Sequence, residues 1–575
     1  MTASSWFVAA SLLVCGLRSV ICGPGPIVQI EQGPLEGTLM KSRYGRTYFA
    51  FQGVPYAQPP VGELRFKEPE PPLPWKGVWN ATEPGSMCLQ WMRVHPPNYG
   101  KQNPLVGDEN CLFVNVYTPK LPTQGSTHNM EVFVYFHSGG WMFGWGHEYG
   151  AKILMDRDVV VVTVVFRLGP LGFLSTGDDV VPGNMGLKDQ SAALHWVKNN
   201  IAAFGGNPNS VTITGTSMGG ASTQYHYLSP LSSGLFHRGI SMSGSTLCPW
   251  AYMEAGPEKA HKLGAPLGCH EKSSKELVEC LRTRPARQIV EKVKHFQVWM
   301  YNPFSPFGPT VETTGSTPFL PKHPVELLLE GKVQDVPWMA GATTEDGLWP
   351  AADWISSDEI LAELDGRFEE LIPLILDFNY TVPSELKKEV VSKIRDFYLQ
   401  GRPVSSLTIK GIIELVTDRI FLLNGVQSAK LQASVVKSPV YFYLFGYRGK
   451  HSFSEVMSGT KRNFGVSHLD DTAYIFDYDF KTDETEQDKE MSELWLDIWM
   501  SFVKTGNPVP AGRNFKWNPV TPNAQVLNYL HIHGPKRLGM QTSDNLGQQK
   551  FWDTLPIDEP QMRIDIPVKV EHNDL

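Results

Sequence analysis

A serine enclosed by glycines could act as a nucleophile in the segment VTITGTSMGG, residues 211–220. The segment fits the pattern Gly-x-Ser-x-Gly, with Gly215 and Gly219 around Ser217. The pattern is weak by itself, because a chain with 52 glycines in 575 residues meets it by chance about one time in three. A serine hydroxyl also needs a base, and the base needs an acid to orient it. Catalysis by Ser217 would therefore require a histidine, an acid and N–H donors for an oxyanion.

Candidates for the missing groups follow other apolar runs. In YFHSGGWMFG, residues 135–144, Gly139 and Gly140 could turn bare backbone N–H groups toward a developing oxyanion. Among 16 histidines, His468 stands in a loop late in the chain, before an apolar run. Glu345 and Asp346 follow the strand-like segment VPWMAG. Acidic pairs in loops are usually only solvated, but the order Ser, Asp, His is that of α/β-hydrolases.

Short apolar runs predict the strands that would position these groups. Continuous runs of this kind are typical of strands buried on both faces of a parallel sheet. Residues 187–204 have helical periodicity and end at two glycines, as a helix C-cap requires. Strand, helix and strand in succession predict an α/β fold with a mostly parallel sheet and helices on both faces. The predicted strands are residues 131–136, 159–166, 211–214 and 239–244.

The same patterns place Ser217 in a turn between a strand and a helix. Residues 211–214 form the predicted strand, and the apolar segment after Ser217 predicts a helix. Gly215 and Gly219 would relieve contacts that a Cβ makes in so tight a turn. The alternative is an ordinary glycine-rich turn with an incidental serine. We favour catalysis, because the turn exposes the hydroxyl at the C-terminal edge of the sheet.

Composition indicates an ordinary globular protein. The chain has 42% hydrophobic residues and a formal net charge of -8, so a nucleic-acid partner is not expected. Residues 1–22 predict a signal peptide, residues 23–555 one large domain, and residues 556–575 a C-terminal tail. No later run reaches about 18 apolar residues, so no membrane anchor is expected. We expect secretion, with retention in the ER lumen through the terminal HNDL as the alternative.

Cysteine usage agrees with the secretory pathway. Without Cys15 and Cys22 of the predicted leader, five cysteines remain, which predicts two disulfides and one free thiol. Pairing between sequence neighbours is the simplest of several possible connectivities. Asn80 and Asn379 stand in Asn-x-Thr acceptor sequences for glycosylation.

Six motifs occur in order along the chain. They are AFQGVPYAQPPVGELRF (50–66), ENCLFVNVYTP (109–119), FRLGPLGFL (166–174), GNMGLKDQSAALHWVKNNIAAFGGNPNSVTITGTSMGG (183–220), SMSGSTLCPW (241–250) and GVSHLDD (465–471). Through these motifs the chain resembles the type-B carboxylesterases of the cholinesterase/carboxylesterase superfamily, in the style of the invertebrate members, over nearly all of residues 25–555.

The resemblance implies an α/β-hydrolase fold and two-step hydrolysis of small apolar esters through an acyl-enzyme, with no metal or cofactor. It implies Ser217 as nucleophile, His468 as general base and acid, and Asp346 as the triad acid, with Glu345 as the competing candidate. The remaining implied positions are the oxyanion N–H groups of Gly139, Gly140 and Met218, the disulfides Cys88–Cys111 and Cys269–Cys280 with Cys248 free, and an acyl pocket of Trp250, Phe304 and Phe307.

The sequence departs from the family pattern at four positions. The triad acid is more often glutamate, and Ser138 replaces the first glycine of the oxyanion loop. Thr216 stands where many members carry glutamate, and Met218 replaces a small alanine. The alternative function is therefore a catalytically weak or inactive adhesion or binding protein on the same fold. Because serine, histidine and oxyanion loop are all retained, we favour the esterase.

Overall fold

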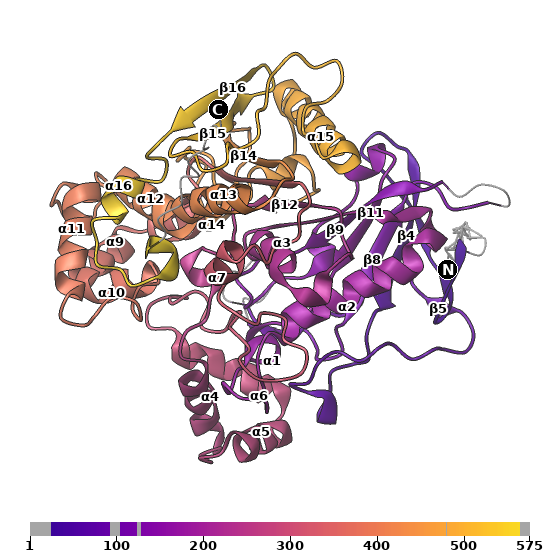
Figure 1. The fold of residues 1–575 in the computed structure, drawn as a ribbon, viewed down its shortest axis with the longest axis horizontal. Coiled ribbons are helices and arrows are strands. Elements are labelled where there is room, and N and C mark those ends of the chain that lie inside the picture. Colours follow the sequence, from indigo (N-terminus) through magenta and orange to yellow (C-terminus); the bar gives the residue numbers. More distant parts are fainter. Residues whose placement is uncertain (1–24, 93–103, 124–127, 479, 564–575) are drawn as a thin grey trace, which may run out of the picture.

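The structure is a computed structural model that describes residues 25–92, 104–123, 128–478 and 480–563. Its centre is an 11-stranded sheet (Figure 1). From edge to edge the strands are β16 (Arg537–Ser543), β15 (Leu527–Gly534), β14 (Val440–Phe445), β13 (Trp338–Thr343), β12 (Arg238–Met242), β11 (Gly206–Thr216), β9 (Met130–Phe136), β10 (Val160–Val164), β8 (Phe113–Thr118), β4 (Thr47–Pro55) and β3 (Thr38–Lys41).

The pairing is parallel in the middle of the sheet and antiparallel at its ends. Every neighbouring pair from β15 across to β10 is parallel. Strand β16 is antiparallel to β15, and β10, β8, β4 and β3 pair antiparallel in turn. The predicted mostly parallel sheet is confirmed. The sequence patterns had not indicated the antiparallel ends.

Alternating side chains of the central strands enter two separate cores. In β9, Val132, Val134 and Phe136 belong to one core, and Phe133 and Tyr135 belong to the other. This alternation explains why the strands read as continuous apolar runs. The first core is covered by α2 (Met185–Asn200), α3 (Met218–Leu228) and α13 (Leu423–Val435), and the second by α15 (Glu486–Thr505).

Two long insertions extend the molecule beyond the sheet (Figure 1). Between β12 and β13 the chain forms α4 (Gly256–Gly264), α5 (Ser274–Thr283), α6 (Ala286–Glu291) and α7 (Pro324–Leu329). Between β13 and β14 it forms α8 (Leu348–Trp354), α9 (Asp358–Gly366), α10 (Phe368–Ile375), α11 (Lys387–Leu399) and α12 (Ile409–Thr417) before α13. A π-helical turn, Asp418–Leu422, joins α12 to α13. The shorter elements are β1 (Ile27–Ile30), β2 (Gly33–Glu36), β5 (Trp79–Asn80), β6 (Gln90–Trp91), β7 (Leu105–Val106), α1 (Gly169–Phe173), α14 (Phe453–Ser458) and α16 (Gln549–Trp552).

The predicted elements around Ser217 are confirmed. The four predicted strands are β9, β10, β11 and β12, and the predicted helix is α2 followed by a 3-10 turn that ends at Gly205, with φ 82°. The segment after Ser217 is α3. The chain past residue 555 also packs against the core, because Glu559 is buried and ion-paired with Arg419.

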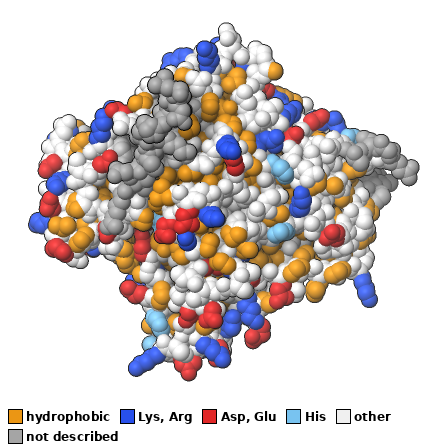
Figure 2. All heavy atoms as spheres, viewed as in Figure 1, with side chains coloured by type: hydrophobic (Ala, Val, Ile, Leu, Met, Phe, Trp, Pro, Cys, Tyr) orange, Lys and Arg blue, Asp and Glu red, His pale blue; other side chains and the backbone are white. Residues whose placement is uncertain are grey.

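The surface mixes charges of both signs. On the face shown in Figure 2, basic and acidic side chains are interspersed, with hydrophobic side chains spread between them. No helix within the described ranges is long and apolar enough to cross a bilayer. The predicted signal peptide, residues 1–22, and the terminal HNDL lie outside the described residues.

Candidate active site

Ser217 occupies a strained turn between β11 and α3. Its φ of 58° and ψ of -121° are rare for a residue with a side chain. The turn closes because its backbone N–H donates to the carbonyl oxygen of Met242 at 2.7 Å. A Cβ at Gly219 would lie 2.0 Å from the carbonyl oxygen of Phe136, so only glycine fits there. The backbone of Ser217 is therefore fixed, and the residue is 5% exposed.

His468 and Asp346 meet at the ends of two different segments. Asp346 follows β13, and His468 lies in the loop after α14. His468 Nδ1 lies 2.9 Å from Asp346 Oδ1, and both side chains are buried. The other carboxylate oxygen, Oδ2, accepts from the backbone N–H of Thr343 at 3.1 Å. Since a carboxylate only accepts, the contact places the imidazole proton on Nδ1 and leaves Nε2 with a free lone pair.

The neighbouring acid, Glu345, has a different set of partners. Its Oε2 accepts from the backbone N–H of Val466 at 2.7 Å and from the hydroxyl of Thr344 at 2.6 Å. Glu345 and Ser467 also pair as an isolated parallel β-bridge. Glu345 thus ties the histidine loop to the end of β13, while Asp346 makes the contact with the imidazole.

Two further carboxyl groups that the sequence analysis did not single out hold the same loop. Asp470 accepts from the backbone N–H groups of Ser467 and Phe453, both at 2.8 Å. Asp471 accepts from the hydroxyl of Tyr443 at 2.7 Å. Burial raises the pKa of Asp470 to about 7 and that of Asp471 to about 6. In the sequence, only the pair of adjacent acids two and three positions after His468 could have indicated them.

The glycine loop after β9 has the backbone geometry expected of an oxyanion site. Gly139 and Gly140 have φ values of 120° and 57°. A Cβ on Gly139 would lie 1.9 Å from the carbonyl oxygen of Phe143, and one on Gly140 would lie 2.2 Å from the ring of Phe304. Among the described residues, neither N–H donates to a protein acceptor. The N–H of Met218 begins α3 and so has no acceptor within the helix.

The Met218 side chain links the serine turn to the glycine loop. Its Sδ accepts from the backbone N–H of Trp141 at 2.6 Å, and the side chain is fully buried. The methionine therefore points into the core and does not line the cavity beside Ser217. Thr216 is buried beneath the turn, where the hydroxyl of Tyr135 donates to its Oγ1 at 3.1 Å.

A narrow cavity of about 30 Å³ lies beside Ser217. Two of the predicted acyl-pocket residues, Trp250 and Phe304, line it, whereas Phe307 is fully buried against Phe296 and does not. The π-helical turn contributes two lining residues, and one of them, Phe421, packs on the ring of His468 at 4.6 Å. The lining residues are Ser217, Trp250, Asn302, Phe304, Trp349, Pro350, Leu374, Ile375, Asp377, Ile420 and Phe421.

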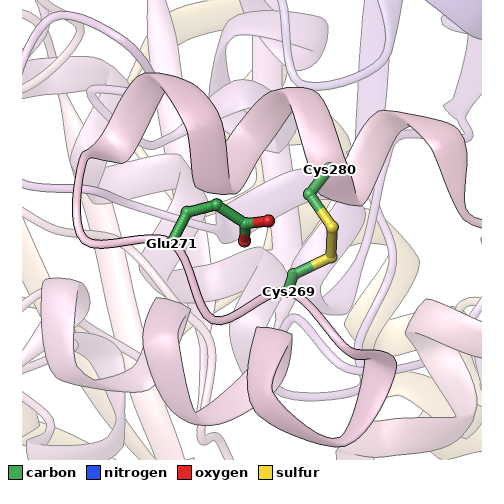
Figure 3. Close-up of side chains that lie close together, drawn as sticks. All are labelled: Cys269, Glu271 and Cys280. Atoms are coloured by element: carbon green, nitrogen blue, oxygen red, sulfur yellow. A yellow bond between two sulfur atoms is a disulfide. The ribbon is translucent and has the colours of Figure 1, made fainter.

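The cysteines form the predicted pairs. Cys88 is bonded to Cys111 and Cys269 to Cys280, which leaves Cys248 as a buried thiol whose pKa burial raises to about 11. Glu271 lies beside the second disulfide, in the one grouping of potential metal ligands within the described residues (Figure 3). Because disulfide sulfurs are not thiolates, this grouping is not a metal site.

The two predicted glycosylation positions differ in exposure. Asn80 is exposed, and its Oδ1 accepts from the hydroxyl of Thr82 at 2.7 Å. Asn379 is half-buried and accepts from the ammonium group of Lys387 at 2.9 Å. Modification at both positions stays a prediction.

Comparison with known proteins relates this geometry to one family. Residues 24–552 match the family described as the carboxylesterase family. The chain is 41% identical to venom carboxylesterase-6 of Apis mellifera, over 93% of this chain and 95% of that protein. It is 42% identical to esterase FE4 of Myzus persicae, over 88% of this chain and 89% of that protein. The crystal structure of juvenile hormone esterase from Manduca sexta, with OTFP covalently attached, superposes with a TM-score of 0.78 at 28% identity, covering 92% of this chain and 98% of that one.

Proposed function

Since the chain belongs to the carboxylesterase family and is a carboxylic ester hydrolase with an α/β-hydrolase fold, we propose that Ser217, His468 and Asp346 are its catalytic triad. The observation that carries the proposal is the 2.9 Å contact between His468 Nδ1 and Asp346 Oδ1, at a histidine that packs on a wall of the Ser217 cavity. The other ring nitrogen, Nε2, is buried and has no partner among the described residues.

In the first half of the reaction, Ser217 Oγ attacks the ester carbonyl as His468 Nε2 takes the hydroxyl proton. Asp346 stabilises the imidazolium that forms and keeps Nδ1 protonated. The carbonyl electrons move to the oxygen, where the N–H groups of Gly139, Gly140 and Met218 stabilise the charge. Each such donor contributes about 3 kcal/mol. The tetrahedral intermediate collapses, the alcohol leaves with the proton from His468, and the acyl group remains on Ser217.

In the second half, water replaces the alcohol. His468 Nε2 takes a proton from the water as its oxygen attacks the acyl-enzyme, and the same N–H groups stabilise the second oxyanion. Collapse returns the proton to Ser217 Oγ and releases the carboxylic acid. The apolar side chains beside Ser217, Trp250 and Phe304 among them, support a site for the acyl part of the ester.

The test is hydrolysis of p-nitrophenyl acetate and butyrate by the purified protein and by Ser217→Ala. Each preparation is also treated with an organophosphate and mapped by mass spectrometry. We expect turnover to be lost in Ser217→Ala and the label to sit on Ser217. The matched control is Ser233→Ala, an exposed serine, which should keep wild-type turnover. Full turnover in Ser217→Ala, or a label elsewhere, would contradict the proposed triad.

We also propose that the protein enters the secretory pathway. Two disulfides and a buried third thiol suit an oxidising compartment. Expression in cultured insect cells, with medium and cell fractions assayed separately, tests the route. Esterase activity in the medium supports secretion. Activity that stays in the cells and moves to the medium when residues 572–575 are deleted would instead identify HNDL as a retention signal.

A further inference from the structure

The cavity beside Ser217 is apolar except at two positions. Aromatic and aliphatic side chains form most of its lining, and apart from Ser217 the polar residues in it are Asn302 and Asp377. They come from the two different insertions, Asn302 from the one before β13 and Asp377 from the one after it. Polar groups in an apolar cavity cost free energy unless they are hydrogen-bonded, so the partners of these two side chains are informative.

Asn302 uses its backbone but not its side chain. Its N–H donates to the carbonyl oxygen of Trp299 at 2.8 Å, and its own carbonyl accepts from the N–H of Val298 at 2.7 Å. The residue is therefore fixed, and it is only 2% exposed. Its amide Nδ2 is buried without any partner among the described residues. The side chain is a rigidly held polar group that the protein leaves unsatisfied.

Asp377 is held just as firmly with its carboxyl group unused. It follows α10 in a left-handed conformation, with φ 53°, and the N–H of Phe378 closes the turn by donating to the carbonyl oxygen of Pro373 at 3.0 Å. Arg419 fixes the preceding residue, because its Nε donates to the carbonyl oxygen of Leu376 at 3.2 Å. The residue is half-buried, and across the described part of the chain no hydrogen bond or ion pair to its carboxyl group is found.

If every group were ionised, the charges around Asp377 would sum to one excess negative charge. Arg419 donates to both carboxylate oxygens of Glu559, at 3.0 and 2.5 Å, so these two charges cancel. Lys259 remains as the balancing cation for both Asp377 and Glu254. Burial, reinforced by Glu254, raises the pKa of Asp377 well above its ordinary value. A hydroxyl group can form a hydrogen bond with this carboxyl group whether the carboxyl is ionised or protonated, so a hydroxyl would be stabilised at this end of the cavity.

We propose that Asn302 and Asp377 bind a hydroxyl group carried by the acyl part of the ester. The hydroxyl would donate to the Asp377 carboxyl group and accept from the Asn302 Nδ2–H. The inference rests on the proposed function, in which Ser217 is the nucleophile and this cavity receives the acyl chain. The chain's methylene groups would contact the apolar lining. A site built to hydrogen-bond a substrate group discriminates strongly against analogues without it, because its own polar groups then stay unpaired.

The experiment compares esters that differ only at the end of the acyl chain. The substrates are ethyl hexanoate, ethyl 6-hydroxyhexanoate and ethyl 6-aminohexanoate, with the butyrate and pentanoate homologues to find the matching length. The released acid is measured by mass spectrometry. For the wild-type protein we expect kcat/KM at the matching length to be about tenfold or more higher for the hydroxyl-ended ester than for its methyl-ended partner. The ammonium ester is the contrast, because an ammonium cannot accept from the Asn302 N–H, and an equal preference for it would overturn the inference.

Variants then assign the preference to the cavity. Asp377→Leu should abolish the preference in kcat/KM for the hydroxyl-ended over the methyl-ended ester, and Asn302→Leu should reduce it. Asp377→Asn, which keeps the shape and one acceptor oxygen, should keep more of the preference than Asp377→Leu does. The ratio is taken within each variant, so a general loss of activity cancels. The matched control is Asp396→Asn, an exposed aspartate on α11, which should keep the wild-type ratio.

The outcomes separate this inference from the proposed triad. A wild-type protein that hydrolyses p-nitrophenyl acetate through Ser217 but shows no preference at any chain length would overturn the inference and leave the triad intact. A preference that survives in both Asp377→Leu and Asp377→Asn would also overturn it. Turnover that persists in Ser217→Ala would reject the triad itself.

Discussion

The acids of the loops that carry the proposed triad and the polar side chains in the wall of the adjacent cavity differ in their partners. In the loops, Asp346, Glu345 and Asp470 each accept hydrogen bonds from the protein itself. In the wall, the buried Asn302 Nδ2 and the half-buried Asp377 carboxyl group have no partner among the described residues. The three acids of the loops are therefore positioned before substrate arrives, as preorganised catalysis requires. In the proposed site, the polar groups of the wall bind the ligand instead.

The largest expected effect comes from replacing each of the two neighbouring acids with its amide. Asp346→Asn should lower kcat by about 10⁴-fold, because an amide no longer holds the imidazole in the required tautomer. Glu345→Gln should lower kcat only about tenfold, because Glu345 contacts the backbone of the histidine loop and not the imidazole. Steady-state kinetics on p-nitrophenyl butyrate measures both. Equal losses in the two variants would show that the acids are not divided as proposed.

A buried ion pair supports the cavity wall beside Asp377, and it can be removed by a single substitution. Arg419 is fully buried and pairs with Glu559. Glu559→Gln should lower the free energy of unfolding by about 3–5 kcal/mol, because it leaves a buried guanidinium without its counter-charge. Urea denaturation followed by tryptophan fluorescence measures the change. Glu369→Gln, at the exposed pair with Lys388, is the control and should change stability by less than about 1 kcal/mol.

The acids of the histidine loop also predict a pH dependence of stability. The folded pKa of Asp470, about 7, lies above its ordinary value because the group is buried. Its contribution is therefore fully present below about pH 4 and is lost as pH rises through 7. In the wild-type protein, the free energy of unfolding should therefore fall by on the order of 1–3 kcal/mol over that pH range. In Asp470→Asn this fall should be smaller.

A second aspartate, Asp488, should change stability with pH in the opposite direction and serves as a control. Asp488 is the third helical residue of α15 and forms a capping box with Thr485, and although Asp488 is buried, its hydrogen bonds with Thr485 lower its pKa. Its stabilisation is present above its unfolded pKa, near 4, and is lost as pH falls through the lower folded value. Asp488→Asn should therefore lower the free energy of unfolding at neutral pH. It should leave unchanged the pH dependence of stability that is due to Asp470. The same slope in wild type and Asp470→Asn would contradict the prediction for Asp470.

The smallest expected effect tests the link between the serine turn and the glycine loop. Met218→Leu keeps the volume and the backbone N–H but removes the sulfur that accepts from Trp141. Losing one hydrogen bond of about 1 kcal/mol should lower kcat about fivefold if the bond positions the oxyanion donors. Met185→Leu, another buried methionine, is the matched control. An unchanged kcat with reduced stability would limit Met218 to a structural role.

Much of this site could be predicted from local sequence patterns. The glycines around Ser217 and at residues 139 and 140 indicated tight turns, because only glycine fits them, and the apolar periods indicated the flanking strands and α2. The choice between Asp346 and Glu345 could not be derived in the same way. Both stand in one short loop, and which carboxylate reaches the imidazole depends on the path of the chain beyond β13.

The sequence by itself determined the mostly parallel sheet, the turn that carries Ser217 and the family, because strand periodicity, glycine spacing and motif order are local properties of the chain. Only the tertiary structure decided the surroundings of Ser217. Asn302 and Asp377 are 75 positions apart in the sequence and lie in separate insertions, so no local pattern relates them. Phe307 shows the reverse, since it is close in sequence to Phe304 yet packs away from the cavity. Such residues meet or separate through long-range packing, which no single window of sequence records.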